Sequence, residues 1–119
     1  MTKDYISQAR AVIAIEQTAL EQISDQLDTG FNAAVEAILD CKGRVIVTGM
    51  GKSGHIARKI AATLASTGTP AFFVHPAEAL HGDLGMVESR DVMLFISYSG
   101  SAKELDYIIP RLKEKSVVL

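Results

Sequence analysis

The sequence predicts an α/β domain built on a doubly wound parallel sheet. Short apolar runs suit strands that are buried on both faces, and amphipathic segments between them suit helices. A glycine-rich turn directly follows the first of these runs. Such alternation is typical of a parallel sheet covered by helices on both faces. We therefore expect, after two N-terminal helices, the order strand, helix, strand, loop, strand, helix and strand.

Composition limits both the size of the domain and its partners. The 119 residues, 48% of them hydrophobic, suffice for one domain with a single core. A formal net charge of −2 gives no basic field for nucleic acid or anionic lipid. The single cysteine, Cys41, excludes an internal disulfide framework and a cysteine-based zinc site. No signal peptide or membrane span is predicted, so we expect a soluble cytoplasmic protein that binds neither nucleic acid nor membrane.

Two helices are predicted before the sheet. Over about 2–27, apolar residues recur at every seventh position, as in an amphipathic helix with a continuous seam: Ile6, Ile13, Leu20 and Leu27. This seam either packs on its own domain or pairs with another subunit, and the sequence favours neither arrangement. A second helix is predicted at about 31–40, with Gly43 as its C-terminal glycine.

The sheet is predicted from four apolar runs. They lie at 44–48, 71–74, 91–96 and 116–119, with helices at 53–66 and 102–115 and a loop at 75–85. The last run ends the chain with no helix to cover it. We therefore expect the sequence to be the N-terminal piece of a larger domain.

The first candidate site is the glycine-rich turn Gly49–Gly54. It lies between a strand and a helix, where free backbone N–H groups and the helix dipole favour an anion. A dinucleotide site would need an acidic residue at 74–76, where Val-His-Pro stands, and a P-loop would need glycine in place of Ile46. The turn therefore either places Lys52 and Ser53 at an anion site or is only a close-packed connection.

Two further segments carry polar side chains at the same predicted edge of the sheet. The serines of 97–101 follow the third strand, and ligands of open parallel sheets bind beyond the carboxyl ends of the strands. This loop should therefore lie beside the glycine turn and complete a phosphate cradle, although Ser101 also suits a plain helix N-cap. His75 and His81 follow the second strand and can act as acids, bases or metal ligands, whereas His55 is expected to be structural.

Several runs of residues resemble the arabinose 5-phosphate isomerases, close to the glucitol-operon branch of that family. These runs are GMGKSGH at 49–55, ASTGTP at 65–70, FFVHP at 72–76, HGDLGM at 81–86, and the residues at 96–97 and 99–100. The similarity covers almost the whole chain from about Cys41 and more loosely the part before it. These enzymes bind phosphosugars in a sugar isomerase (SIS) domain, so the resemblance implies a SIS-type sheet with the flavodoxin-like strand order.

The resemblance implies an enzyme that interconverts D-ribulose 5-phosphate and D-arabinose 5-phosphate. This reaction is the first step toward the lipopolysaccharide sugar 3-deoxy-D-manno-octulosonate (KDO). No cofactor is implied, but zinc at His75 is implied as an inhibitor, together with a homo-oligomer, either a dimer or a tetramer. By position, the catalytic residues are Lys52, Glu104 and His81. The residues implied to bind substrate or phosphate are Gly51, Ser53, Gly68, Thr69, His75, His81, Ser97, Ser99 and Gly100.

The chain differs from the family in two respects. Many SIS domains follow the serine loop with an acidic residue and then Ser or Thr, where this chain has Ser101-Ala102. The family also has a C-terminal half with another catalytic acid, a catalytic histidine and usually a pair of CBS domains. Within this chain we expect N-terminal helices at 1–40 and a phosphosugar-binding core at 41–119. An isomerase of another sugar phosphate and a non-catalytic phosphosugar-binding module are the alternatives.

Overall fold

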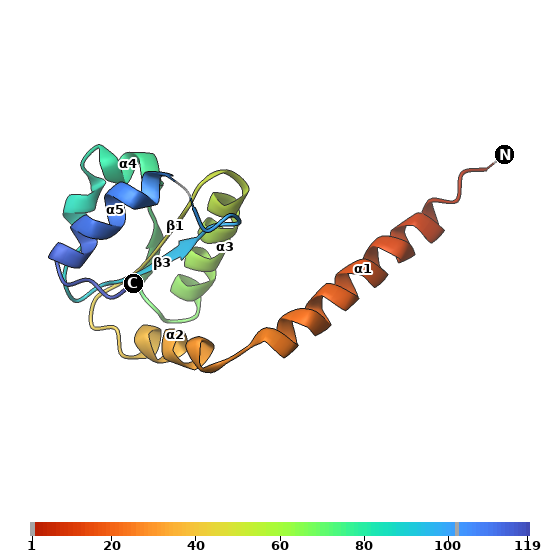
Figure 1. Ribbon diagram of the computed structural model, residues 1–119, viewed down its shortest axis with the longest axis horizontal. Helices are drawn as coiled ribbons and strands as arrows, with labels where there is room; N and C mark the ends of the chain where they lie inside the picture. The colour runs from red at the N-terminus through yellow and green to blue at the C-terminus, as the bar shows by residue number, and fades with distance from the viewer. Residues whose placement is uncertain (1, 102) are drawn as a thin grey trace. The chain divides into compact units, whose positions relative to one another are not determined.

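The chain separates into two compact units, residues 1–35 and 36–119. The computed structural model describes residues 2–101 and 103–119 (Figure 1). Within those two ranges, no helix combines the length and the apolar character that crossing a membrane requires.

The first unit is dominated by helix α1 (Tyr5–Gln26), which confirms the helix predicted there. The helix begins after Asp4, whose carboxylate accepts a 3.0 Å hydrogen bond from the backbone N–H of Ser7. No residue of α1 is buried. The side chains of seven-residue spacing, three in α1 and Leu27 at its C-cap, are called the α1 seam below and are 54–66% exposed: Ile6, Ile13, Leu20 and Leu27. Helix α2 (Thr29–Leu39) follows.

The second unit contains a parallel sheet of three strands in the order β2-β1-β3. The strands are β1 (Val45–Gly49), β2 (Ala71–Phe73) and β3 (Val92–Ile96), and Val45 pairs with the first residue of both neighbours. Val118 forms a parallel bridge to Val92 on the free edge of β3. The predicted doubly wound parallel class is therefore confirmed, and the last apolar run begins to pair as a strand would.

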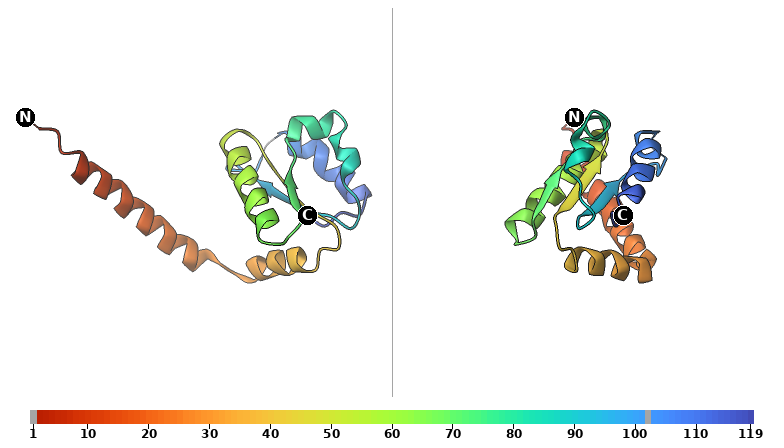
Figure 2. Two further views of the ribbon diagram at one scale, coloured as in Figure 1. Left: turned by 180° about the vertical axis from the view of Figure 1, so that it is seen from behind. Right: turned by 90° about the vertical axis from the view of Figure 1, so that its left-hand side faces the viewer.

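Helices cover both faces of the sheet. Helix α3 (Gly51–Ser66) packs on one face, where Val45 and Val47 lie against Ala57 and Ala61. Helices α4 (Pro76–Leu80) and α5 (Lys103–Glu114) cover the other face (Figure 2). There the second cluster forms around Ile46, with Val74, Ala79, Leu84, Val87, Met93, Ile108, Leu112 and Val117. Because β1 is central, its side chains are fully enclosed, as its apolar run predicted.

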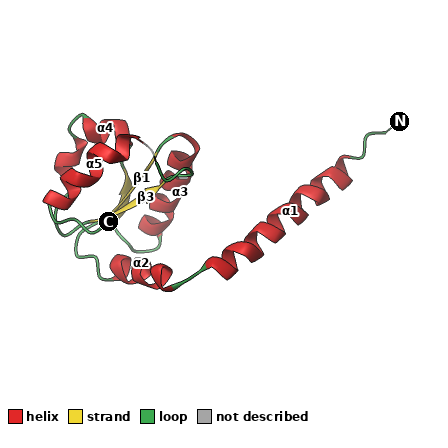
Figure 3. Cartoon of the chain, in the orientation of Figure 1, coloured by secondary structure: helices red, strands yellow, loops and turns green. Residues whose placement is uncertain are grey.

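The structure corrects two local predictions. Residues 75–85 are not a loop, because α4 and a short 3₁₀ helix (Asp83–Met86) form there (Figure 3). Proline at the first helical position and the His75 side chain, which accepts a 3.1 Å hydrogen bond from the Ala77 N–H, start this helix. Gly43 is not a helix-ending glycine. Its N–H donates to the Arg90 carbonyl, and a Cβ there would collide with the Asp91 carboxylate.

Candidate functional site

The two turns expected to form a site leave the sheet at adjacent points. Strand β1 ends at Gly49 and β3 ends at Ile96, and these two residues are register partners. Their contact is so close that a Cβ on Gly49 would lie 2.9 Å from the Ile96 carbonyl oxygen. The glycine-rich turn and the serine loop are therefore neighbours, as the parallel topology predicted.

The glycine-rich turn delivers the N-terminus of α3 to this edge. The helix begins at Gly51 rather than at Ser53, with Met50 as its N-cap and no side-chain hydrogen bond to close it. Gly51 has φ +57°, a left-handed conformation that glycine adopts without strain. Because the first N–H groups of a helix have no intrahelical partner, those of Gly51, Lys52 and Ser53 suit an anion.

The serine loop is held by its own hydroxyl groups. Ser97 Oγ accepts a 2.9 Å hydrogen bond from the Gly100 N–H, and Ser99 Oγ accepts one of 3.2 Å from the Ser101 N–H. Each hydroxyl that accepts in this way still has its own proton to donate to a phosphate oxygen. Helix α5 begins at Lys103. Residue 102, directly before it, lies outside the described residues, so Ser101 as the helix N-cap stays a prediction.

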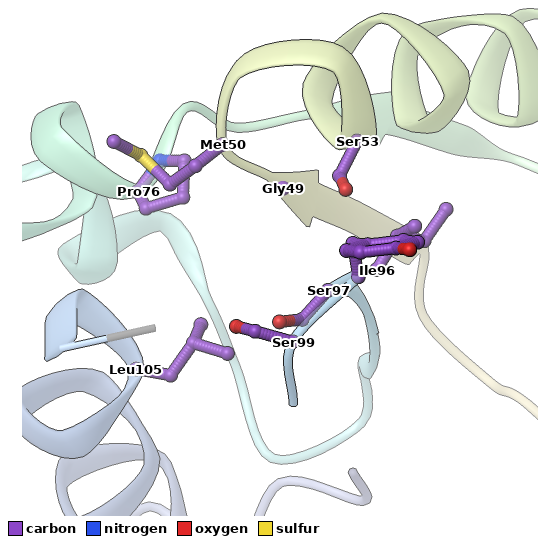
Figure 4. A pocket seen from close by; sticks show the side chains of 9 residues that line it. Gly49, Met50, Ser53, Pro76, Ile96, Ser97, Ser99 and Leu105 are labelled. Atoms are coloured by element: carbon purple, nitrogen blue, oxygen red, sulfur yellow. The ribbon is translucent and has the colours of Figure 1, made fainter. Parts of the chain in front are cut away.

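Between these two turns lies a pocket of about 250 Å³, called the cradle below. It is lined by Gly49, Met50, Ser53, Pro76, Ile96, Ser97, Tyr98, Ser99 and Leu105. Figure 4 shows Ser53 projecting from the first turn of α3 toward the loop that carries Ser97 and Ser99. A second hollow of about 610 Å³ shares four of these residues and adds Lys52 and Ile56. The cradle thus brings three serine hydroxyl groups together, and Lys52 lines the hollow beside it.

A third hollow, of about 160 Å³, lies against the same glycine-rich turn. It is lined by Gly49, Gly51, Gly54, His55, Arg58, Phe73 and His75. His75, predicted to bind substrate, is therefore placed here rather than among the residues that line the cradle. His55, expected to be structural, lies in the same hollow.

Five of the predicted site residues do not line these three hollows, and one of them is Gly100, in the serine loop beside the cradle. His81 is exposed at the C-cap of α4, and Glu104 is half-buried in the first turn of α5, next to the cradle residue Leu105. Gly68 and Thr69 precede β2 and therefore lie at the amino edge of the sheet, opposite the cradle. Their roles stay predictions.

Comparison with known proteins assigns this fold and site to a family. The model of the SIS domain matches residues 38–118. This chain belongs to the SIS domain family. The α/β sheet with its two polar turns is therefore a SIS fold, and its cradle is formed by the two segments for which the sequence predicted a phosphate site.

Named relatives are similar over nearly all of this SIS chain. It is 61% identical over 119 residues to arabinose 5-phosphate isomerase GutQ of Escherichia coli K12, and 52% identical over 116 residues to arabinose 5-phosphate isomerase KdsD of Yersinia pestis. These matches cover 100% and 98% of the chain but only 37% and 35% of the relatives. The chain thus spans little more than a third of their length.

A solved structure also shares the fold. The E. coli CFT073 protein c3406, in complex with arabinose 5-phosphate, superimposes with a TM-score of 0.89 at 44% sequence identity. The match covers 98% of this SIS chain and 63% of that one.

Sequence reasoning missed two features of the site. Tyr98 is fully exposed and lines both the cradle and the hollow beside it. Its position between two predicted phosphate serines was the available signal. Arg58 stacks over Phe73, with 4.1 Å between the guanidinium carbon and the ring centroid. Fifteen positions separate these residues, and no sequence motif links them.

Proposed function

We propose that this SIS domain is the phosphosugar-binding part of an enzyme that interconverts D-ribulose 5-phosphate and D-arabinose 5-phosphate. The observation that carries the proposal is the cradle, where hydroxyl groups from two turns converge on the N-terminus of α3. Such a site suits a phosphate because donors and the helix dipole act together. The names of the relatives and the arabinose 5-phosphate in the related structure support the choice of sugar.

The chemistry of this reaction sets what the residues must do. Aldose–ketose isomerisation removes a proton from carbon 2 of the aldose, forms an enediolate and returns a proton to carbon 1. It therefore needs a base at carbon, acid and base help at the oxygens, and positive charge near the enediolate. In our proposal Glu104 is one of the proton-transfer groups, Lys52 stabilises the enediolate or the phosphate, and His81 assists at an oxygen or in ring opening.

The remaining substrate contacts belong to the same proposal. Gly51, Ser53, Ser97, Ser99 and Gly100 hold the phosphate, and His75 contacts the sugar. Gly68 and Thr69 lie at the opposite edge of the sheet, so their predicted contact with the sugar would have to come from a second copy of the chain. The product would enter KDO and lipopolysaccharide synthesis in the cytoplasm. No cofactor is needed, because an enediolate forms by proton transfer alone, and neither nucleic acid nor membrane is a partner.

Inhibitory zinc at His75 stays a prediction. Among the residues of 2–101 and 103–119, no three His, Cys, Asp or Glu side chains are grouped so that they could hold a metal ion. The hollow at His75 offers two imidazoles, those of His55 and His75, next to a guanidinium. A zinc ion there would need further ligands, so we derive no step of the reaction from it.

The test is the substitution Glu104→Gln in the full-length protein. We expect turnover of ribulose 5-phosphate to fall by roughly a hundredfold or more, because a positioned acid–base group contributes about that factor, while arabinose 5-phosphate still binds. Asp106→Asn is the matched control, since Asp106 is an exposed carboxylate in the same helical turn. Unchanged turnover in the Gln variant, or an equal loss in the control, would remove Glu104 from the mechanism.

A second candidate is a SIS module that binds a phosphosugar without converting it. It is favoured by one observation: Glu104 and His81 do not line the cradle, whereas the phosphate serines do. A third candidate is an isomerase of another sugar phosphate. A thermal-shift titration with arabinose 5-phosphate, run beside the turnover assay, separates them, because stabilisation without turnover indicates the binding module.

We also propose that the protein is a homo-oligomer that associates through the α1 seam. None of α1 is buried, although Ile6, Ile13, Leu20 and Leu27 form an apolar line along a helix of 22 residues. Exposed apolar surface of this length favours association with a second copy.

A further inference from the structure

The hollow at His75 differs in chemistry from the cradle. The cradle presents hydroxyl groups and apolar side chains, whereas this hollow presents one guanidinium and two imidazoles around three glycines. No carboxylate is among its lining residues. All three of its ionisable side chains therefore carry either positive charge or N–H donors.

Arg58 packs over an aromatic ring and has no anionic partner among residues 2–101 and 103–119. Its guanidinium lies 4.1 Å above the centre of the Phe73 ring, which holds the group by a cation–π contact. Among the described residues, the ion pair found is that of Arg90 with Glu88, and Arg58 takes no part in it. Stacking covers the flat face of a guanidinium and leaves its N–H edge available for hydrogen bonds to an oxyanion.

His75 is held in one orientation by the same ring and by its own helix. Its imidazole meets the edge of Phe73, with 6.4 Å between the ring centroids and 76° between the planes. Its Nδ1 accepts a 3.1 Å hydrogen bond from the Ala77 N–H. A neutral imidazole that accepts at Nδ1 carries its proton at Nε2, so the free side of the ring is a donor.

We propose that this hollow is a second anion subsite, in which Arg58 binds the phosphate or carboxylate group of a small molecule and His55 and His75 donate from its flanks. The glycine turn separates it from the cradle, since Gly49 lines both. A ligand with two anionic groups could therefore span the turn. Lys52, Glu104 and His81 do not line the subsite, but Gly51 and His75 do, so it adjoins the substrate site of the proposed function and its test uses phosphate and malonate rather than turnover.

The same geometry disfavours a divalent cation. Arginine stays protonated at any relevant pH, and its charge repels a metal ion at close range. Only two side chains among the residues lining the hollow could act as metal ligands, whereas structural zinc sites use four protein ligands and catalytic sites three. Anion binding and zinc binding thus make opposite predictions for Arg58. Removing its charge should weaken the binding of an anion and strengthen the binding of a cation.

The experiment is an NMR titration of the complete 119-residue chain. The Hε1 signals of its three histidines are followed while inorganic phosphate, or malonate as a carboxylate probe, is added. We expect saturable shifts of His55 and His75, with His81 as an internal reference because it does not line the hollow. Arg58→Gln should weaken binding about tenfold or more, the usual effect of losing a charged hydrogen bond. The affinity of the Arg58→Lys variant should lie between those of the wild type and Arg58→Gln, because lysine keeps the charge but not the planar guanidinium group.

Lys59→Gln is the matched control, since Lys59 is an exposed cation one position along the same helix. Ser97→Ala separates the two sites, because it should alter binding in the cradle and leave the shift of His55 intact. The proposal is overturned if Arg58→Gln and Lys59→Gln weaken phosphate binding equally, or if the His81 signal shifts as much as those of the other two histidines. It is also overturned if Arg58→Gln tightens zinc binding while phosphate binding is unchanged.

Discussion

At the scale of single residues, two glycines decide how closely helix and strand can approach at the site. A Cβ on Gly54 would lie 2.6 Å from the Gly49 carbonyl oxygen, so only hydrogen fits between the first turn of α3 and the end of β1. Gly54 is buried, and this contact sets where the cradle serine Ser53 projects. The absence of a Cβ at Gly54 thus determines where the Ser53 hydroxyl group lies.

Gly54→Ala is expected to destabilise the fold and displace the cradle. The added methyl must push apart two backbone segments, and overpacking of this kind costs about 1–3 kcal/mol. Thermal unfolding should detect the loss, and phosphosugar binding should weaken with it. Gly85→Ala is the control, because a Cβ there meets nothing within 4 Å and Gly85 has no positive φ. Equal stability of the two variants would contradict this account.

A second residue-scale prediction concerns the start of α1. Hydrogen bonds from the Ser7 side chain and then its backbone N–H lower the pKa of Asp4 below its ordinary value of 3.8. Because the folded pKa is the lower one, the cap is intact above pH 3.8 and is lost as the pH falls through the folded value. The Ser7 amide signal, followed by NMR, should titrate below pH 3.8. Asp4→Asn should abolish the titration while keeping much of the cap; a midpoint above 3.8 would be inconsistent with this cap.

At the scale of elements, periodicity predicted those parts of the fold in which burial decides the structure. The run Val45–Val47 has no exposed surface and lies in the central strand, so its composition reflects its environment directly. Residues 75–85 were predicted less well. Helix α4 has only five residues, too few for a helical period, and it is started by Pro76 and the His75 side chain. Capping interactions determine whether so short a segment becomes helical, and the pattern of apolar residues gives no sign of them.

Gly43 shows a second limit of prediction from the sequence. A glycine after a helix suits a left-handed C-cap, but the same residue also suits a place where another backbone comes close. The second reason applies here, since Arg90 and Asp91 lie against Gly43. Those residues are almost fifty positions away, so only the tertiary structure distinguishes the two roles.

The α1 seam gives an element-scale prediction for the proposed oligomer. Leu20→Asp should convert the oligomer to a monomer at the same concentration, because a charge in a packed seam is desolvated without a partner. Light scattering after size-exclusion chromatography measures the mass. Gln22→Asp is the control: it adds the same charge to the opposite face of the same helix. A monomeric wild type, or an oligomer that survives Leu20→Asp, would exclude the α1 seam as the interface.

Charge along α1 further predicts the orientation of the pair. Lys3 and Arg10 outnumber Asp4 toward its start, whereas Glu16, Glu21 and Asp25 lie toward its end. Parallel copies would place like charges together, and antiparallel copies place unlike charges together. In a Cys41→Ser background, a mixture of Ile6→Cys and Ile23→Cys chains should therefore cross-link to each other. Preferential cross-linking of each variant to itself would indicate the parallel pair.

At the scale of the whole molecule, the cradle could be predicted from the sequence and the hollow at His75 could not. Parallel strands end at one edge, so a sequence with polar turns after two neighbouring strands already places those turns together. The register pair Gly49 and Ile96 confirms this step. The hollow depends on Arg58 packing over Phe73, a contact between a helix and a strand that no spacing rule encodes.

Hydrogen exchange should distinguish the two units by their dependence on concentration. The amides of β1 lie in the middle strand of the sheet and should exchange most slowly, at a rate independent of protein concentration. Those of α1 should be protected only when a second copy covers the seam, so their protection should rise with concentration by mass action. Leu20→Asp should remove that dependence and leave β1 unchanged. Protection of α1 that is equal at all concentrations would mean that its apolar face is covered within one chain.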